Sequence, residues 1–266
     1  MLYPELFFPR YSSALLFFGT TRIKWFRDST LLVRHAINGC TSEKNAMLTI
    51  PDFLLPNEIL EMNAIMDVAE YDDGRTTAKG IAIDVKSNRQ VSRRWTKVAA
   101  LDAILEMALR RSRLFREVLS PNAYSPAIYS KYLAGDGYGP HVDAVMSGMP
   151  PMRQDVSMTI FLSPNDSYTG GELCLHHCVS NKQTVKLPAG NAFAYPTNVV
   201  HEVLPVESVE RRVAVLWIQS FFRDSDIREM VADLRRCVET AKAIPLGDPL
   251  TISKVLGNLE RKFISS

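Results

Sequence analysis

The feature that most constrains the fold is a series of short β-like segments between residues 126 and 222, separated by turn-forming residues. Val156, Met158 and Ile160 alternate with Ser157 and Thr159, as in a strand with two different faces. Similar segments follow at Gln183–Leu187, Asn191–Tyr195, Val199–Leu204 and Arg212–Gln219. Short strands at regular spacing are typical of a sandwich or a jelly roll. The sequence therefore predicts a mainly β domain.

Helical patterns flank this β-rich interval on both sides. Before it we expect a short strand at Met47–Phe53, a helix from Pro56 to Glu70, a turn at residues 72–74, an edge strand or loop over residues 75–90, and one long helix from Ser92 to Leu119. After it the helical period returns from Ser225, and a last helix is expected near Ile252–Phe263. The C-terminal part, about residues 224–266, is therefore predicted to be helical.

Residues 1–46 differ in texture from the rest of the chain. Their apolar clusters are short and are broken by Pro, Arg, Ser and Thr, so a secretory signal is not favoured. We expect residues 1–46 to be an extension that is poorly ordered or not part of the domain. The domain is then expected to start at Met47. The domain itself is expected to span residues 47–266.

Charge and cysteine content exclude several classes of protein. Residues 47–266 carry 25 Lys and Arg against 26 Asp and Glu, so the basic excess that nucleic acids and anionic membranes require is absent. No apolar run reaches the ~18–20 residues of a membrane-spanning helix. The four cysteines form no C-x-x-C pair, which favours a reducing compartment and a cytoplasmic protein.

Two histidines and one aspartate form the candidate metal site. His141-Val142-Asp143 ends a glycine-rich turn, and on extended backbone His141 and Asp143 point to the same side. His201 lies on a later predicted strand and can supply a third ligand. Two imidazoles and one carboxylate are the facial triad of non-haem Fe(II) oxygenases, which leaves about three positions open for a chelating keto acid and O2. H-x-D alone is also typical of a solvated surface turn, so the argument depends on the whole set.

A keto acid with a second carboxylate also needs a fixed cation. Arg211 follows His201 by ten residues and begins an apolar strand, where a guanidinium can bind a carboxylate through two hydrogen bonds. Arg212 is expected to face the opposite side. Tyr132 can add a hydroxyl to the same carboxylate, although a packed strand tyrosine is an equal alternative.

The chain resembles the Fe(II)/2-oxoglutarate-dependent dioxygenases of the prolyl 4-hydroxylase type, and more closely the bacterial PKHD-type hydroxylases. The resemblance begins at Met47 and reaches the final helices. The matching segments are Asp73–Ala78, Val85–Gln90, Tyr132–Asp143, Ser157–Leu162, Gly170–Leu173, Lys186–Gly190, Trp217–Ser220 and Arg223–Asp224.

This resemblance implies a double-stranded β-helix with flanking helices. It implies Fe(II) at His141, Asp143 and His201, 2-oxoglutarate at Arg211, and ascorbate to keep the iron reduced. The expected reaction hydroxylates a substrate with O2 and decarboxylates 2-oxoglutarate to succinate. The substrate, a small molecule or a protein side chain, stays open, and the family is only loosely linked to iron homeostasis.

Other functions remain possible from the sequence. A non-catalytic iron and 2-oxoglutarate sensor on the same fold is the main alternative, and a jelly-roll binding module with a structural metal is a weaker one. The terminal helices can pack a homodimer.

Three smaller groups of residues carry their own expectations. Cys174, His176 and Cys178 can be taken as a zinc site, but thiolates four residues apart on a strand are ~13 Å apart, so ordinary strand residues are favoured. Lys86, Asn88 and Arg89 form either a substrate contact or a solvated polar edge. Trp217 and Phe161 are expected in the core.

Overall fold

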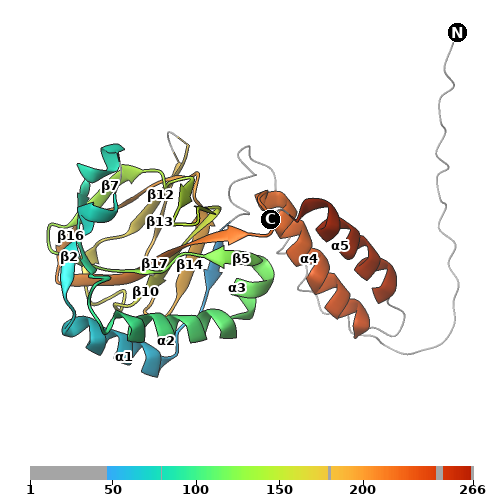
Figure 1. The fold of residues 1–266 in the computed structure, drawn as a ribbon, viewed down its shortest axis with the longest axis horizontal. Coiled ribbons are helices and arrows are strands. Elements are labelled where there is room, and N and C mark those ends of the chain that lie inside the picture. The colour runs from blue at the N-terminus through green and yellow to red at the C-terminus, as the bar shows by residue number, and fades with distance from the viewer. Residues whose placement is uncertain (1–46, 79, 179–180, 244–247, 265–266) are drawn as a thin grey trace, which may run out of the picture. The chain divides into compact units, whose positions relative to one another are not determined.

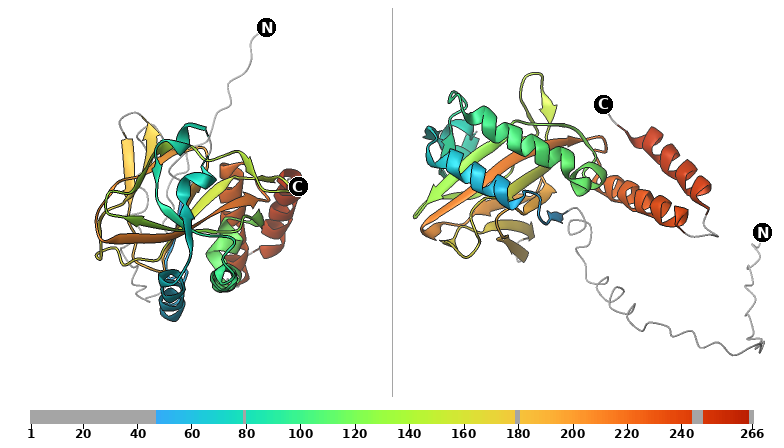
Figure 2. Two further views of the ribbon diagram at one scale, coloured as in Figure 1. Left: turned by 60° about the vertical axis from the view of Figure 1, so that its left-hand side comes forward. Right: turned by 90° about the horizontal axis from the view of Figure 1, so that it is seen from below.

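The computed structural model describes residues 47–78, 80–178, 181–243 and 248–264, so the predicted extension at residues 1–46 lies outside the described part. Two antiparallel sheets form the centre of the domain (Figure 1). Helices α1 and α2 cover the outer face of the larger sheet, as the two further views also show (Figure 2). This arrangement confirms the predicted mainly β architecture with flanking helices.

The larger sheet has eight strands. In spatial order seven of them are β1 (Leu48–Ile50), β14 (Ala192–Pro196), β10 (Val156–Phe161), β17 (Glu210–Ser220), β6 (Ile128–Leu133), β4 (Arg89–Val91) and β2 (Tyr71–Asp73). The eighth, β5 (Pro121–Tyr124), also pairs with β17. Because β17 is the longest strand and pairs with three neighbours, it is the central support of this sheet.

The smaller sheet has five strands and carries the candidate histidines. Its spatial order is β13 (Asn181–Val185), β12 (Leu173–Cys178), β15 (Val200–Val203), β7 (Gly137–His141) and β3 (Lys86–Ser87). Two short ribbons complete the described strands, β11 (Thr169–Gly170) with β16 (Val206–Ser208) and β8 (Met146–Ser147) with β9 (Met152–Arg153).

Alternation along the strands divides the interior into two cores. On β10, Met158 and Ile160 join a core shared with helices α1 (Pro56–Asp67) and α2 (Val98–Arg111), while Phe161 joins a core between the two sheets. Side chains of successive strand residues point to opposite faces, so one strand supplies both cores. The core between the sheets surrounds the pocket described below.

The predicted helix at Ser92–Leu119 is wrong in its continuity. It is two helices, α2 and α3 (Arg113–Val118), separated at Ser112, which has extended backbone at φ −68° and ψ 111°. The Ser112 hydroxyl accepts a hydrogen bond from the backbone N–H of Phe115 at 3.2 Å and so caps the start of α3. A serine side chain competes with the helix for backbone hydrogen bonds, and this favours a break at Ser112. The helical spacing of apolar residues continues across Ser112, so that spacing alone did not reveal the break.

The segment at residues 75–90, left open as an edge strand or loop, contains both kinds of structure. It holds two short 3-10 helices, Gly74–Thr77 and Gly80–Ile83, followed by β3 and the start of β4. The turn expected at residues 72–74 is instead the end of strand β2, with the first 3-10 helix beginning at Gly74. The strands of this segment border the pocket.

The C-terminal helices occur where the sequence predicts them. They are α4 (Ser225–Lys242) and α5 (Pro249–Phe263), which lie side by side (Figures 1 and 2). Arg235 joins them through an ion pair to Glu260 at 2.9 Å and also donates to the Glu117 carbonyl at 2.9 Å. No helix in the described ranges is both long and apolar enough to cross a bilayer.

An ion pair between the buried Glu58 of α1 and the exposed Arg111 of α2 gives a first prediction. Glu58 is 5% exposed, and its carboxylate accepts hydrogen bonds from the Leu55 backbone at 2.8 Å and from Arg111 at 2.8 and 2.7 Å. Glu58→Ala leaves the Leu55 N–H without its acceptor and returns the exposed Arg111 to solvent, so it is expected to lower the free energy of unfolding by about 1–2 kcal/mol in urea denaturation. Glu61→Ala, exposed on the same helix, is the control, and an equal loss there would contradict this reading.

Candidate active site

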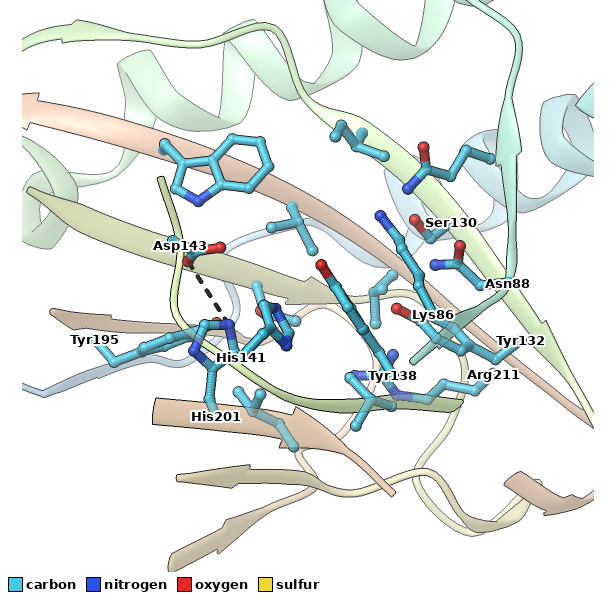
Figure 3. Close-up of a pocket in the computed structure, with 18 residues that line it drawn as sticks. Lys86, Asn88, Ser130, Tyr132, Tyr138, His141, Asp143, Tyr195, His201 and Arg211 are labelled. Atoms are coloured by element: carbon cyan, nitrogen blue, oxygen red, sulfur yellow. Dashed lines mark ion pairs between the residues drawn. The ribbon is translucent and has the colours of Figure 1, made fainter. Parts of the chain in front are cut away.

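The two candidate histidines meet because their strands pair. His141 ends β7 and is the direct cross-strand partner of His201 on β15, and their ring centroids are 4.3 Å apart. Asp143 follows β7, and its Oδ2 lies 3.7 Å from His201 Nε2. One ligand atom from each of the three residues lies within 4.8 Å of the others (Figure 3). The structure therefore brings together the full predicted set.

Hydrogen bonds fix which nitrogen of each histidine is free. His141 Nδ1 is 2.8 Å from the Gly139 carbonyl, and His201 Nδ1 is 3.0 Å from the Val199 carbonyl. A carbonyl oxygen only accepts, so each Nδ1 carries the proton and donates it. In the neutral imidazole this leaves the lone pair on Nε2, which is the tautomer a metal requires.

Burial keeps the His141 imidazole neutral. Desolvation first, and then the neighbouring His201, lower the pKa of His141 to about 4. The third member, Asp143, accepts a short hydrogen bond from the Ser157 hydroxyl on β10. A neutral histidine and an oriented carboxylate need no rearrangement of protons to act as ligands.

Arg211 occupies the other end of the same pocket (Figure 3). It is 1% exposed, and its Nε and one terminal nitrogen have no hydrogen-bond partner in the part of the chain the structure describes. Its guanidinium carbon lies 5.0 Å from the Tyr132 ring and 5.8 Å from the Phe161 ring. Aromatic faces offset only part of the cost of burying this charge, so the site is suited to receive an anion.

Tyr132 stands next to Arg211 as its cross-strand partner on β6. It is 4% exposed and lines the pocket. Burial raises the pKa of Tyr132, with Arg211 and Asn88 acting in the opposite direction. The hydroxyl therefore stays protonated at neutral pH and can donate a hydrogen bond to an acceptor beside Arg211.

A glycine makes room for the Arg211 side chain. Gly171 has φ +68°, and a Cβ there would stand 2.9 Å from Arg211 Cδ and 2.9 Å from a Val206 methyl. Both the backbone conformation and the close approach require glycine at this position.

Arg212, the neighbour of Arg211, faces away from the pocket as expected. It forms ion pairs with Asp67 at 2.7 Å and with Glu210, and donates to the Asn63 carbonyl at 3.1 Å. The contacts to Asp67 and Asn63 hold α1 against β17, so Arg212 contributes to structure outside the candidate site.

Sequence reasoning missed several residues of the pocket. The Tyr138 ring stacks on His141 with centroids 3.6 Å apart, and the Tyr195 ring stands edge-on to His201 at 5.1 Å. Residues three apart on a regular strand point to opposite faces, and the pairing of β7 with β15 shifts register between these positions, so strand spacing gave no signal for this contact. Trp217, expected in the core, lines the pocket, whereas Phe161 is a core residue as predicted.

The structure groups Cys174 and His176 with Glu202, whereas the sequence analysis considered them together with Cys178. Cys174, His176 and Glu202 each place one potential ligand atom within 4.8 Å of the others, while the Cys178 side chain lies outside the described part. Glu202 accepts from His176 at 2.8 Å and from Lys182 at 3.2 Å. These side chains alternate with Leu173 and Leu175 of the inter-sheet core, so they lie on the outer face of the smaller sheet.

Comparison with known proteins identifies the family. Residues 127–219 match the model of the 2OG-Fe(II) oxygenase superfamily. A PKHD-type hydroxylase of Acaryochloris marina is 40% identical over 189 residues, which are 71% of this chain and 84% of that protein. A PKHD-type hydroxylase of Synechococcus elongatus is 35% identical over 222 residues, which are 82% of this chain and 99% of that protein.

A solved structure supports the fold assignment. An oxidoreductase of the 2OG-Fe(II) oxygenase family from Burkholderia pseudomallei matches with a TM-score of 0.50 and 19% identity, covering 65% of this chain and 84% of that one. The predicted double-stranded β-helix is thereby confirmed. The chain belongs to the PKHD-type hydroxylases of the 2OG-Fe(II) oxygenase superfamily, and it is an Fe(II)- and 2-oxoglutarate-dependent hydroxylase.

Proposed function

We propose that His141, Asp143 and His201 bind Fe(II), and that Arg211 and Tyr132 bind the distal carboxylate of 2-oxoglutarate. The observation that carries the proposal is a single pocket with three convergent ligand atoms at one end and a buried guanidinium with unpaired nitrogens at the other. A dicarboxylic keto acid has the two ends that such a pocket needs.

The donor set suits Fe(II) in kind and in protonation state. Two imidazole nitrogens and one carboxylate oxygen form the facial triad of non-haem iron oxygenases. The backbone carbonyls behind both histidines fix each Nε2 as the free nitrogen, and Ser157 orients Asp143. No proton has to leave His141 when the metal binds, because burial already holds its imidazole neutral.

Arg211 and Tyr132 suit a carboxylate for equally direct reasons. A guanidinium presents parallel N–H groups that match the two oxygens of a carboxylate, and a protonated tyrosine adds a third donor. The pairing would supply the hydrogen bonds that two Arg211 nitrogens lack. Bound together, iron and 2-oxoglutarate supply the O2-dependent oxidative chemistry, with succinate and CO2 as products.

The chain's own residues position these groups and exclude water. Tyr138 covers one face of the His141 ring, and Tyr195 borders His201. Leu173 and Val213 line the pocket as part of the core between the sheets. Apolar walls of this kind strengthen the electrostatic contacts inside and protect reactive species from water.

Four further properties belong to the proposal, each with its own support. Ascorbate keeps the metal reduced, as the family resemblance implies. A cytoplasmic location accords with free thiols at Cys174 and Cys237. The balanced charge of residues 47–266, taken as the functional domain, speaks against a nucleic-acid partner. A homodimer through the C-terminal helices accords with exposed apolar residues on α5, such as Leu250 and Val255.

Succinate formation tests the proposed reaction. The full chain, purified without oxygen and loaded with Fe(II), is expected to form succinate slowly from 2-oxoglutarate when exposed to O2 and ascorbate. Binding of both ligands without any succinate would favour the sensor alternative. Failure to bind either ligand would refute the assignment of the pocket.

Gly171 provides a second test that leaves every proposed ligand intact. Gly171→Ala places a methyl group against Arg211 Cδ and is expected to raise the KM for 2-oxoglutarate by about tenfold. Gly135→Ala is the matched control, because Gly135 has φ +91° and open space around the added Cβ. It introduces similar backbone strain, about 1 kcal/mol, without touching the pocket. Equal KM values in the two variants would argue against a role for the Arg211 position.

A further inference from the structure

A second row of polar side chains faces the pocket from β3 and β4. Lys86, Asn88 and Gln90 are 8%, 5% and 5% exposed, whereas Ser87 and Arg89 between them are exposed. All three buried residues line the pocket that holds His141 and Arg211. Strand alternation therefore separates this segment into an inward row and an outward row. The solvated polar edge considered from the sequence holds only for the outward residues.

Two residues of the inward row, Lys86 and Asn88, have hydrogen-bonding groups that the described part of the protein leaves without partners. Neither the nitrogen nor the oxygen of the Asn88 side-chain amide has a hydrogen-bond partner of ordinary geometry among the described residues, although the amide lies close enough to the Tyr132 hydroxyl to lower its pKa. Lys86 Nζ donates to Thr77 Oγ1 at 2.9 Å. The negative charges of Asp143 and Asp73 act on it from a distance, without forming an ion pair within the described residues. An ammonium has three N–H groups, so at least two remain for another partner. Buried polar groups are nearly always paired, which points to a ligand here.

These two residues stand where the pocket meets a wider groove. Lys86 and Asn88 line both the pocket and an adjoining groove bordered by Tyr71, Arg75 and Asp84. The Lys86 ammonium lies 4.8 Å from the centre of the Tyr138 ring, which in turn stacks on His141 (Figure 3). A molecule that enters through the groove would therefore contact Lys86 and Asn88 on its way to the proposed metal ligands.

We propose that Lys86 and Asn88 bind a carboxylate of the substrate that is hydroxylated. The substrate class is then a carboxylate-bearing small molecule or side chain. One ammonium and one amide N–H match the single negative charge and the acceptor oxygens of a carboxylate. This inference rests on the proposed function, since it requires Arg211 to be occupied by 2-oxoglutarate.

Thr77 and Gly74 preset the geometry of this subsite. The Thr77 hydroxyl holds Lys86 Nζ and lies 3.0 Å from Gln90 Oε1. Gly74 donates its N–H to the Asn88 carbonyl at 2.9 Å, and a Cβ on Gly74 would overlap the Asn88 side-chain oxygen at 1.6 Å. The first 3-10 helix thus supports the inward row from behind, and only glycine leaves space for the Asn88 amide.

Matched pairs of small molecules test the charge requirement. The probes are glycolate with glycolamide, L-lactate with L-lactamide, and L-alanine with L-alaninamide. Each is titrated by ligand-observed NMR into the full chain containing Zn²⁺ in place of iron and saturating 2-oxoglutarate. We expect at least one carboxylate to bind about 10–100-fold more tightly than its amide partner. Equal binding within every pair, or no binding up to about 10 mM, would overturn the proposal.

Variants on the two faces of the same strand locate the effect. Lys86→Gln and Lys86→Met are both expected to remove the preference for the carboxylate, and two replacements guard against a folding defect in one. Arg89 lines the adjoining groove but not the pocket, so Arg89→Gln removes the same charge outside the proposed subsite and is expected to leave the preference unchanged. An equal loss in Arg89→Gln would refute the assignment to the inward row.

The co-substrate is a second possible source of the carboxylate, and the same samples separate the two. If Lys86→Gln weakens 2-oxoglutarate binding and leaves the probes unaffected, Lys86 serves the co-substrate and the proposal is wrong. If the wild-type chain does not bind 2-oxoglutarate at all, the proposed function fails first. Normal 2-oxoglutarate binding together with absent probe binding rejects the subsite alone.

Discussion

Replacing His141 by alanine is expected to lower succinate formation by at least about 100-fold. The reason is that His141 and His201 are direct cross-strand partners whose Nε2 atoms are both held free by backbone carbonyls. Removing one imidazole leaves only His201 and Asp143, which is too few protein ligands to hold iron in an open facial site. The loss should appear first as weaker metal binding, measured by titration calorimetry with Mn²⁺ under anaerobic conditions.

His176→Ala is the control for this variant. His176 also lies on a strand of the smaller sheet, but its imidazole bonds to Glu202 on the outer face. It should leave both metal binding and succinate formation within about twofold of the wild type. Full 2-oxoglutarate-dependent activity in His141→Ala would show that the metal ligands are assigned wrongly.

The sequence predicted which side chains converge on the pocket better than it predicted the helices around it. His141, His201 and Arg211 lie on strands and Asp143 follows one closely, and strand alternation and pairing restrict which side chains can meet. The break at Ser112 illustrates the opposite case, since the helical period continues across it and only the capping hydrogen bond reveals the end of α2. Local patterns of this kind indicate where an element exists more reliably than where it stops.

The remaining parts of the pocket depend on contacts between distant segments. Ser157 reaches Asp143 across two sheets, and Gly171 makes room for Arg211 forty residues away. The Asn88 amide packs against Gly74 and lacks a hydrogen-bond partner of ordinary geometry among the described residues. The spacing of residues along the sequence does not predict either property. Such properties follow from how the two sheets are set against each other, and so they required the structure.

The two sheets divide the chemistry between them. The smaller sheet carries the proposed metal ligands His141 and His201, while β17 of the larger sheet carries Arg211. In the proposed function, metal and co-substrate would thus be held from opposite walls, and the packed core between the sheets fixes the distance between those walls. Substitutions in this core are expected to disturb the co-substrate position even where they touch neither group.

Arg211→Met is expected to separate function from stability. Loss of two charge-assisted hydrogen bonds to a carboxylate corresponds to about 3–4 kcal/mol, so the KM for 2-oxoglutarate should rise by about 10²–10³-fold. Arg211→Lys keeps the charge but not the paired N–H groups, and an intermediate KM is expected. Steady-state succinate formation at varied 2-oxoglutarate concentrations measures both.

Stability should change in the other direction or not at all. Without 2-oxoglutarate, Arg211 is a fully buried charge with two nitrogens unpaired within the described residues, which opposes folding. Arg211→Met should therefore have a free energy of unfolding equal to or above that of the wild type. Arg212→Met, which breaks the ion pairs to Asp67 and Glu210 outside the pocket, should lose stability while keeping its KM. If Arg211→Met were instead the destabilised variant with an unchanged KM, Arg211 would be a structural residue and 2-oxoglutarate would bind elsewhere.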